Sequence, residues 1–434
     1  MSQAQLAGPD LSDSYVSLIE SGKRTPTPVV ARLLAERLGC TTEFLLHGIE
    51  PRQRIDTELG LRHAELELYH GDAEVAAERF GEIIKAAGEE NAMLAAHARH
   101  GRARALEGQG KIGPAVEAFE RLRREAAAHP ERLADLPLTV ALSRCYQRAG
   151  DSLRARDLGG HALRQVARLA LTHGEIAVDL ASALVEAAGV HPQQNSALSY
   201  VRQVLADNGV PPAVDREAEV HALWRASVTA AQGEDSALAV RLADDALATG
   251  RPARMAVRLA RIAMDWSRLA VTGSGTLHID EARGYATAAT EIFAVFPAAT
   301  REHAASLIVL AQVQFKGHKP AEAAKLAASS LDVLSGAASA TAAHAHLVLA
   351  RVALAQGEGD VPVALRRARD ILDTVTSPEE HDRQVARAWR ELGDLYGETG
   401  AEDDQAAAYR KALETVGVRS VLNGVAMDTA VLTR

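Results

Sequence analysis

Residues 2–24, SQAQLAGPDLSDSYVSLIESGKR, predict two short helices joined by a tight connection. Ser2 is a favoured N-cap residue, so a first helix is expected over residues 3–7, where the Gly-Pro pair that follows ends it. Ser12 has the same role for a second helix over residues 13–20, which a glycine two residues beyond its end closes in the left-handed conformation. The stretch therefore contains two helices of about two turns each.

The second predicted helix has one apolar and one polar side. Val16 and Ile19 lie three residues apart, on the side that can pack against Leu6 of the first helix. The opposite side carries small polar groups, which are Asp13, Ser14 and Ser17. A helix fits the major groove of DNA, and its first turn can reach base edges, so this pair of helices has what a helix-turn-helix needs.

Four successive motifs follow this pattern over residues 1–48. They are SQ-x-x-LA, then S-x-SYVS-x-IE-SGKR-x-P, then a Leu-rich helix over residues 27–38 that ends in LG, then E-F-LL in a short helix over residues 41–46. This order resembles the phage-repressor (Cro-type) helix-turn-helix domain. In particular, it resembles the bacterial regulators that join this domain to tetratricopeptide-like helical repeats.

The resemblance implies a set of DNA contacts, which is Gln3, Ser12, Asp13, Ser14, Tyr15, Ser17, Lys23 and Arg24. Within it, Gln3 is expected at a phosphate, the polar side of the second helix at the bases, and Tyr15 with the Lys-Arg pair along the DNA backbone. Glu20 and Gly22 are implied to be structural. The same residues also fit local roles: Ser12 and the serine two positions later as caps, Tyr15 as a packed aromatic, and the Lys-Arg pair as a solvated turn.

One feature departs from the resembling domain, in which a further helix precedes SQ-x-x-LA and covers its apolar side, whereas this sequence starts at Met1. The residues that would lose partner surface are Leu6, Val16, Ile19, Leu33, Leu34, Leu38, Leu45 and Leu46. At roughly 25 cal/mol per Å² of apolar surface, the loss amounts to several kcal/mol, which a small domain cannot easily absorb. We therefore expect the first helix to be missing because the start codon lies upstream; the alternative is a degraded head that no longer binds DNA.

The composition predicts an all-α fold. The chain has 434 residues, of which 47% are hydrophobic and 4% aromatic. Abundant Ala and Leu with few aromatic residues favour helices that pack closely on small side chains, and the length allows more than one domain. Cys40 and Cys145 stand alone in different segments, so neither a disulfide framework nor a thiolate metal site is implied. Without a long apolar run or a signal sequence, we expect a cytoplasmic protein with no membrane attachment.

The charge balance limits how DNA can be bound. A net charge of −9 argues against nonspecific binding of polyanions by the whole molecule, because phosphate affinity requires clustered Lys and Arg. Residues 1–48 hold four basic and five acidic side chains, so one copy would bind double-stranded DNA weakly. This favours a homodimer that doubles the contacts and reads a two-fold site.

From about residue 56 the sequence repeats a helix, a turn and a second helix. The turn glycines or their equivalents fall at Gly71, Gly110, Gly150, Gly189, Gly233, near Gly273, and at Gly317, Gly357 and Gly400. A regular spacing of this kind indicates stacked helical hairpins, an α-solenoid. The last unit resembles a tetratricopeptide repeat through Trp389, Leu392, Gly393, Tyr396, Gly400, Tyr409 and Ala412.

These signals divide the chain into four parts. They are a helix-turn-helix head over residues 1–48, a linker over 49–55, a repeat domain over 56–417 and a tail over 418–434. Two segments break the repeat rhythm, 189–195 and 271–277, and are candidate hinges.

The first helices of such hairpins line a concave face that suits extended peptides or partner helices. In this register the inward-facing candidates are His100, Arg104, Arg144, Gln147, Gln314 and Arg390. Their basic groups would suit the carboxylates of a peptide. The alternative is that each is exposed or paired with a neighbouring acid.

No catalytic or metal constellation emerges. The pairs His97 and His100, and His344 and His346, have no third ligand at metal-site spacing. A phosphate-binding loop after a strand, a nucleophile elbow and an HExxH motif are all missing from the sequence, so neither an enzyme nor a cofactor is expected.

These features together favour a dimeric, sequence-specific transcription regulator. The resemblance further implies that an oligopeptide, another small ligand or a protein binds the repeat groove and changes the geometry of two DNA-binding heads. The alternative from another class is a tetratricopeptide-type interaction scaffold with a vestigial head.

Overall fold

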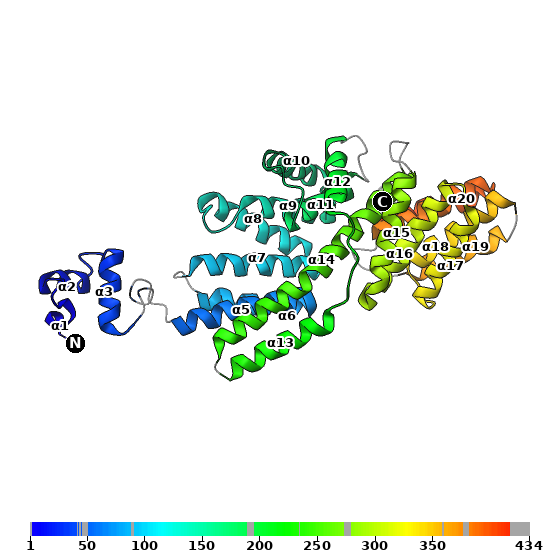
Figure 1. Cartoon of the computed structure of the whole chain (residues 1–434). Helices are drawn as coiled ribbons and strands as arrows, with labels where there is room; N and C mark the ends of the chain where they lie inside the picture. The colour runs from blue at the N-terminus through cyan, green and yellow to red at the C-terminus, as the bar shows by residue number, and fades with distance from the viewer. Residues whose placement is uncertain are drawn as a thin grey trace, which may run out of the picture. The chain divides into compact units, whose positions relative to one another are not determined.

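The computed structural model describes residues 2–40, 42, 45, 51–87, 91–188, 195–233, 235–272, 279–357, 360–375 and 382–416. Every regular element within these ranges is a helix (Figure 1), so the fold is all-α, as the composition predicted. None of the described helices is both long enough and apolar enough to cross a lipid bilayer. The chain divides into two compact units, the first made of residues 1–135 and 216–250 and the second of residues 136–215 and 251–434.

The head contains the helices α1 (Gln3–Ala7), α2 (Asp13–Glu20) and α3 (Pro28–Leu38). Ser2 and Ser12 cap the first two, each hydroxyl accepting a backbone N–H three residues later at 3.2 Å. Thr27 caps α3 in the same way, and Gly39 ends it in the left-handed conformation, with φ 67°. These bounds confirm the helices predicted over the head, while the short helix expected over residues 41–46 lies largely outside the described residues.

A small apolar core holds the head helices together. Its members are Leu6, Ala7, Val16 and Leu34, with Leu11, Ile19, Val30 and Leu45 partly buried around them. Val16 keeps only 1% of its surface exposed, so the apolar side of α2 faces inward, as predicted. Leu38 at the end of α3, by contrast, remains 44% exposed.

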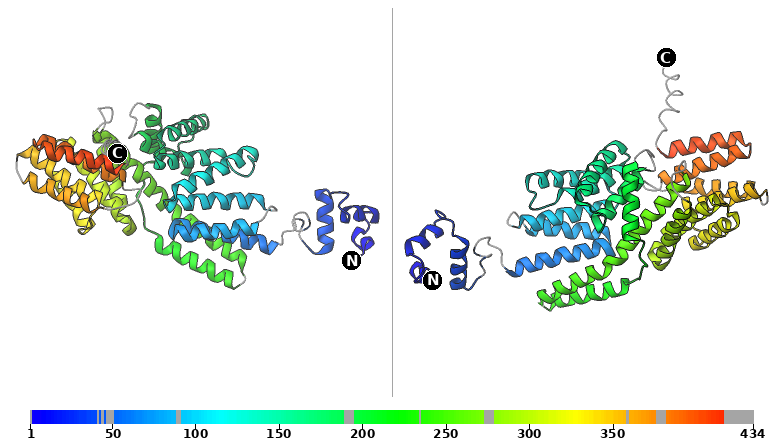
Figure 2. Two further views of the ribbon diagram at one scale, coloured as in Figure 1. Left: turned by 180° about the vertical axis from the view of Figure 1, so that it is seen from behind. Right: turned by 45° about the horizontal axis from the view of Figure 1, so that its top comes forward.

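Helical hairpins make up the rest of the first unit (Figures 1 and 2). Their helices are α5 (Pro51–His70), α6 (Ala73–Ala87), α7 (Ala92–Gly108), α8 (Ile112–Ala128), α13 (Glu217–Gln232) and the first part of α14 (Ser236–Thr272). In a regular solenoid each hairpin packs on its neighbours in the chain. Here the hairpin α13–α14 packs against α5 instead, with Leu59 and Val220 in one apolar cluster. Arg62 Nε also donates to Asp244 Oδ1 at 2.8 Å, 182 residues later.

The second unit begins with α9 (Asp135–Ala149) and continues to α21. The boundary between the units falls just after Asp135, the first residue of α9. Its other helices are α10 (Ser152–Leu169), α11 (Glu175–Ala188), α12 (Asn195–Asn208), the remainder of α14, α15 (Ile279–Val295), the 3-10 turn η1 (Pro297–Ala299), α16 (Thr300–Lys316), α17 (Pro320–Leu334), α18 (Ala340–Gln356), α19 (Val361–Thr374), α20 (Asp382–Glu398) and α21 (Glu402–Thr415). Trp266 and Phe293, 2% and 1% exposed, belong to its largest core.

The predicted turn glycines fall where the hairpins turn. Those that stand between two described helices are Gly71, Gly110, Gly150, Gly233, Gly317, Gly357 and Gly400, while Gly189 and Gly273 lie outside the described residues. Close approach between helices depends on a further glycine within α7. A Cβ at Gly101 would lie 2.4 Å from the ring of Phe80 on α6, a residue with no exposed surface. Only a residue without a side chain fits there.

The expected connections need adjustment at some positions. Helix α5 begins at Pro51, so residues 51–55 of the predicted linker 49–55 are helical. Most of the two candidate hinge segments lies outside the described residues, and so does the predicted tail 418–434.

Candidate nucleic-acid interface and ligand cavity

The solvent side of α2 carries the polar residues that the sequence assigned to DNA bases. Asp13, Ser14 and Ser17 are all exposed. Val16, between them in sequence, is buried in the head core. The three exposed residues lie in the first five positions of α2, the part of a recognition helix that reaches base edges in the major groove.

Both ends of α2 are closed by local hydrogen bonds. The Ser12 hydroxyl accepts the Tyr15 N–H at 3.2 Å. At the other end, the Lys23 N–H donates to the Leu18 carbonyl oxygen at 2.9 Å, across a turn in which Gly22 has a φ of 69°. This is the Schellman arrangement, which favours glycine at its left-handed position. Capping at both ends lets so short a helix keep its form.

Two cationic side chains, Lys23 and Arg24, are exposed just after α2. The Arg24 guanidinium carbon lies 4.6 Å from the centroid of the half-buried Tyr15 ring. A cation over an aromatic face contributes about 0.5–1 kcal/mol at an exposed site, so Tyr15 holds this arginine near the surface of α2. Two of the three residues assigned to the DNA backbone, Tyr15 and Arg24, are therefore in contact with each other.

Gln3 and Glu20 link the start of α1 to the end of α2. The Gln3 Nε2 donates to Glu20 Oε2 at 2.6 Å. A side-chain amide has two N–H donors, so one can be fixed by Glu20 while the other is directed elsewhere. This geometry is compatible with a phosphate contact by Gln3 and with a structural role for Glu20.

Sequence reasoning missed the part that Arg37 has in the head. Its Nη1 donates to the carbonyl oxygens of Leu6, at 2.9 Å, and Ala7, and its Nη2 pairs with Asp10. Both carbonyls lie at the end of α1, beyond the reach of its own N–H groups, and that of Ala7 also accepts the Leu11 N–H at 3.2 Å. A Cβ at Gly8 would lie 2.7 Å from the guanidinium carbon, so the glycine leaves room for it. A basic residue in the last turn of α3 gave no sign of this long-range contact.

In the first unit, the predicted ligand residues His100 and Arg104 lie on α7 and already have protein partners. Arg104 Nη1 donates to the Tyr69 hydroxyl at 2.6 Å, and its guanidinium lies over that ring, 5.2 Å from the centroid. The His100 ring meets Phe119 edge to face, with 6.1 Å between centroids. Both side chains are half-buried.

Arg144, on α9 in the second unit, faces acidic residues of α11. Its Nη1 lies 3.9 Å from Asp179 Oδ2, and Arg258 Nη1 of α14 lies 3.2 Å from Asp179 Oδ1. The same Arg258 atom lies 3.8 Å from Glu175 Oε2. Arg144 is thus paired with a neighbouring acid, the alternative that the sequence left open.

The remaining candidates in the second unit are scattered. Gln147 is buried on α9, where its Nε2 donates to the Glu186 carbonyl oxygen at 3.5 Å. Gln314 is buried on α16, and Arg390 is exposed on α20. Within the described part of the chain, the Oε1 atoms of both glutamines meet no hydrogen-bond partner. Of the four candidates in this unit, Arg144 and Gln147 lie one turn apart on α9, whereas Gln314 and Arg390 lie on two other helices.

Among the described residues, no group of three or more His, Cys, Asp or Glu side chains is placed to hold a metal ion.

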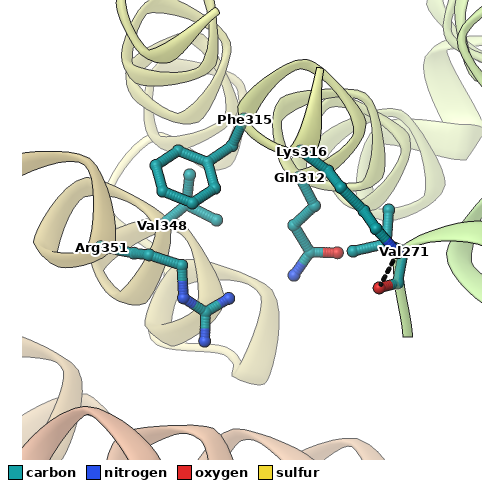
Figure 3. Close-up of a pocket in the computed structure, with 6 residues that line it drawn as sticks. All are labelled: Val271, Gln312, Phe315, Lys316, Val348 and Arg351. Carbon is teal, nitrogen blue, oxygen red and sulfur yellow. Dashed lines mark hydrogen bonds between the residues drawn. The ribbon is translucent and has the colours of Figure 1, made fainter. Parts of the chain in front are cut away.

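A cavity of about 210 Å³ lies within the second unit, between the end of α14 and the helices α16 and α18 (Figure 3). Its lining residues are Val271, Gln312, Phe315, Lys316, Val348 and Arg351. Lys316 Nζ donates to the Val271 carbonyl oxygen at 3.0 Å, at the C-terminal end of α14. None of these six residues was predicted as a ligand contact from the sequence, because three separate helices bring them together. Gln314, their neighbour in sequence, was predicted as a ligand contact from the repeat register.

Charged groups from α18 and α20 lie beside this cavity. Arg351 Nη1 lies 2.9 Å from Glu391 Oε1, and His344 Nε2 lies 3.7 Å from Glu391 Oε2. His344 Nδ1 lies 2.8 Å from the Ala340 carbonyl oxygen, which can only accept, so Nδ1 carries a proton. Burial lowers the pKa of His344, although Glu391 opposes this shift, so the ring is neutral near pH 7.

Residues 1–45 match the protein family described as helix-turn-helix. The head is a Cro-type helix-turn-helix. Beyond this head, the described part of the chain consists of helical hairpins. A comparison with curated proteins finds no match to the chain.

Solved structures with a similar arrangement of helices share little sequence with this chain. One is a Rap protein complexed with Competence and Sporulation Factor, 12% identical over 93% of this chain and 90% of that chain, with a TM-score of 0.46. Another is the apo form of the quorum sensor NprR from B. thuringiensis, 10% identical over 96% of this chain and 98% of that chain, with a TM-score of 0.47. Likeness at this level says nothing about what the Cro-type head or the hairpins bind.

Proposed function

We propose that the protein is a cytoplasmic bacterial transcription regulator that binds double-stranded DNA at specific sequences as a homodimer. The observation that carries this proposal is the match of residues 1–45 to the helix-turn-helix family, together with the exposed polar side of α2. The buried Val16 and the two capped ends give α2 one fixed side toward solvent. Sequence-specific recognition requires such a preset surface.

The proposed contacts divide into two kinds. Asp13, Ser14 and Ser17 would read base edges, where a carboxylate accepts from cytosine N4 and a hydroxyl can donate or accept. Gln3 and Arg24, with the neighbouring lysine, would contact phosphates, which position the head without reading sequence. Ser12 would contribute by holding the first turn of α2.

The proposed dimer follows from the charge balance of the head. With four basic and five acidic side chains in residues 1–48, the phosphate contacts of one head are few. Two heads double these contacts and read two half-sites about 34–36 Å apart, one helical turn of DNA. The hairpins would set this distance, and a peptide or other small ligand bound to them would change it. Such a ligand acts only through its difference in affinity for the two arrangements.

Selection from a random duplex library with the purified full-length chain tests the proposal. We expect enrichment of one two-fold sequence, bound at least about 10³ times more tightly than unrelated duplex at physiological salt. Equal retention of all duplexes would contradict sequence-specific binding and would favour the scaffold alternative. Sedimentation of the complex on the selected duplex should show two chains per site.

A further inference from the structure

We propose that the cavity between α14, α16 and α18 binds a small carboxylate that carries an apolar group. This proposal deepens the ligand-sensing part of the proposed function by naming a site and a ligand class. The cavity lies wholly within the second unit, so it does not depend on how the two units are arranged.

Part of the cavity wall is apolar. Val348 is 2% exposed and belongs to the same cluster as the half-buried Phe315. Figure 3 shows the Phe315 ring and the Val348 side chain together, on the side of the cavity away from Val271. Such a surface favours a ligand with an apolar group, because it shields that group from water.

Two cationic side chains border the cavity. In Figure 3 the Arg351 guanidinium lies on the same side as Phe315 and Val348, the Lys316 ammonium lies on the opposite side next to Val271, and the Gln312 amide lies between the two cations. A guanidinium carries five N–H donors in a rigid fork that matches a carboxylate, and an ammonium adds a point charge. Because Gln312 can donate as well, all three polar side chains can donate to an anionic oxygen.

The charges around the cavity favour an anion over a cation. Two cationic lining side chains, Lys316 and Arg351, stand against one carboxylate, Glu391, which pairs with Arg351. Glu391 therefore partly neutralises Arg351 and leaves one positive charge in excess. His344 adds no charge near pH 7, since burial lowers its pKa. One ligand carboxylate would bring this excess of positive charge closer to balance.

The cavity also limits the size of its ligand. Its volume of about 210 Å³ is smaller than the roughly 300–1,000 Å³ of pockets that enclose drug-sized ligands. A carboxylate with a short branched or aromatic tail fits this range, either alone or as the end of a longer molecule. The simple probe 4-methylpentanoate has both groups.

Titration of 4-methylpentanoate into the full-length chain without DNA, followed by saturation-transfer NMR, tests the proposal. The matched ligand is the neutral amide 4-methylpentanamide, which keeps the apolar tail. We expect the acid to bind at least about tenfold more tightly than the amide, because only the acid gains charge-assisted hydrogen bonds. Equal affinities, or no binding of the acid up to millimolar concentrations, would overturn the proposal.

A charge inserted into the cavity provides a second test. Gln312→Glu keeps the side-chain size and adds a carboxylate beside the ligand, so we expect at least about a tenfold loss of acid binding. Gln232→Glu, the same change at an exposed position of α13, should leave binding unchanged. Equal binding by Gln312→Glu and the parent chain would overturn the assignment of this cavity. Since no DNA is present, a failure here is separate from a failure of sequence-specific DNA binding.

Discussion

Arg37 donates through Nη1 to the carbonyl oxygen of Leu6, 31 residues earlier in the chain, at 2.9 Å. The same guanidinium donates to the Ala7 carbonyl oxygen and pairs with Asp10. Helix α1 has only five residues, so it cannot hold itself together. One side chain of α3 therefore caps α1 at its C-terminus and ties it to the connection that leads to α2.

Arg37→Ala should open α1. A hydrogen bond from a charged donor contributes about 1.5–3 kcal/mol, less where the group is partly exposed as Arg37 is, so we expect backbone amides of residues 3–10 to exchange about tenfold faster. Hydrogen exchange followed by mass spectrometry measures this. Arg32→Ala, at an exposed position of the same helix, is the matched control and should leave exchange in α1 unchanged. Unaltered exchange in Arg37→Ala would show that α1 is held by its apolar contacts alone.

The base-facing and backbone-facing roles in the head can be separated by mutation. Ser14→Ala combined with Ser17→Ala should weaken binding at particular base pairs, by about 1–3 kcal/mol at each pair that is read. Arg24→Ala should weaken all duplexes alike and reduce the salt slope of log K by about 1. Competition binding on single-base variants of the selected duplex, at several salt concentrations, measures both. If both variants lose affinity equally on every sequence, the base-facing assignment is wrong.

Local signals predicted the head and the hairpins well. Ser2, Ser12 and Gly22 act on their own neighbours in sequence, so capping and turn chemistry place α1 and α2 correctly. The turn glycines work in the same way, since each closes a helix that starts nearby. Composition and the spacing of the turn glycines were enough to predict the fold class.

Contacts between distant segments could not be predicted in this way. Nothing in the residues around Leu59 indicates that Val220 will pack on it, because any apolar face can meet any other. The same holds for the candidate ligand residues. The residues around Arg144 gave no sign that Asp179 of the next hairpin would lie beside it. The cavity containing Arg351 likewise combines helices far apart in sequence.

Gly101→Ala should destabilise the first unit. The added Cβ would lie 2.4 Å from the buried Phe80 ring, and overpacking of this kind lowers the free energy of unfolding by about 1–3 kcal/mol. Gly81→Ala in α6 is the control, because its Cβ would meet no atom within 4 Å and alanine favours a helix by about 0.5–1 kcal/mol. Urea unfolding should therefore move in opposite directions for the two variants. Equal urea midpoints for the two variants would mean that α6 and α7 move apart to accept the added Cβ with no loss of unfolding free energy.

Acidification should weaken the second unit through His344. Burial lowers its pKa below the ordinary value of 6.5, while Arg387 and Arg268 disfavour the charged ring and Glu391 favours it. Above pH 6.5 the ring is neutral whether the chain is folded or unfolded, so the stability is fully present. As the pH falls toward the folded-state pKa, the unfolded chain binds the proton first, and stability falls by up to about 1.4 kcal/mol per pH unit. Between pH 7.5 and 5.5, the urea midpoint should drop less in His344→Gln than in the parent chain. If the midpoints of the two proteins fall in parallel with pH, His344 is not the cause of the acid destabilisation.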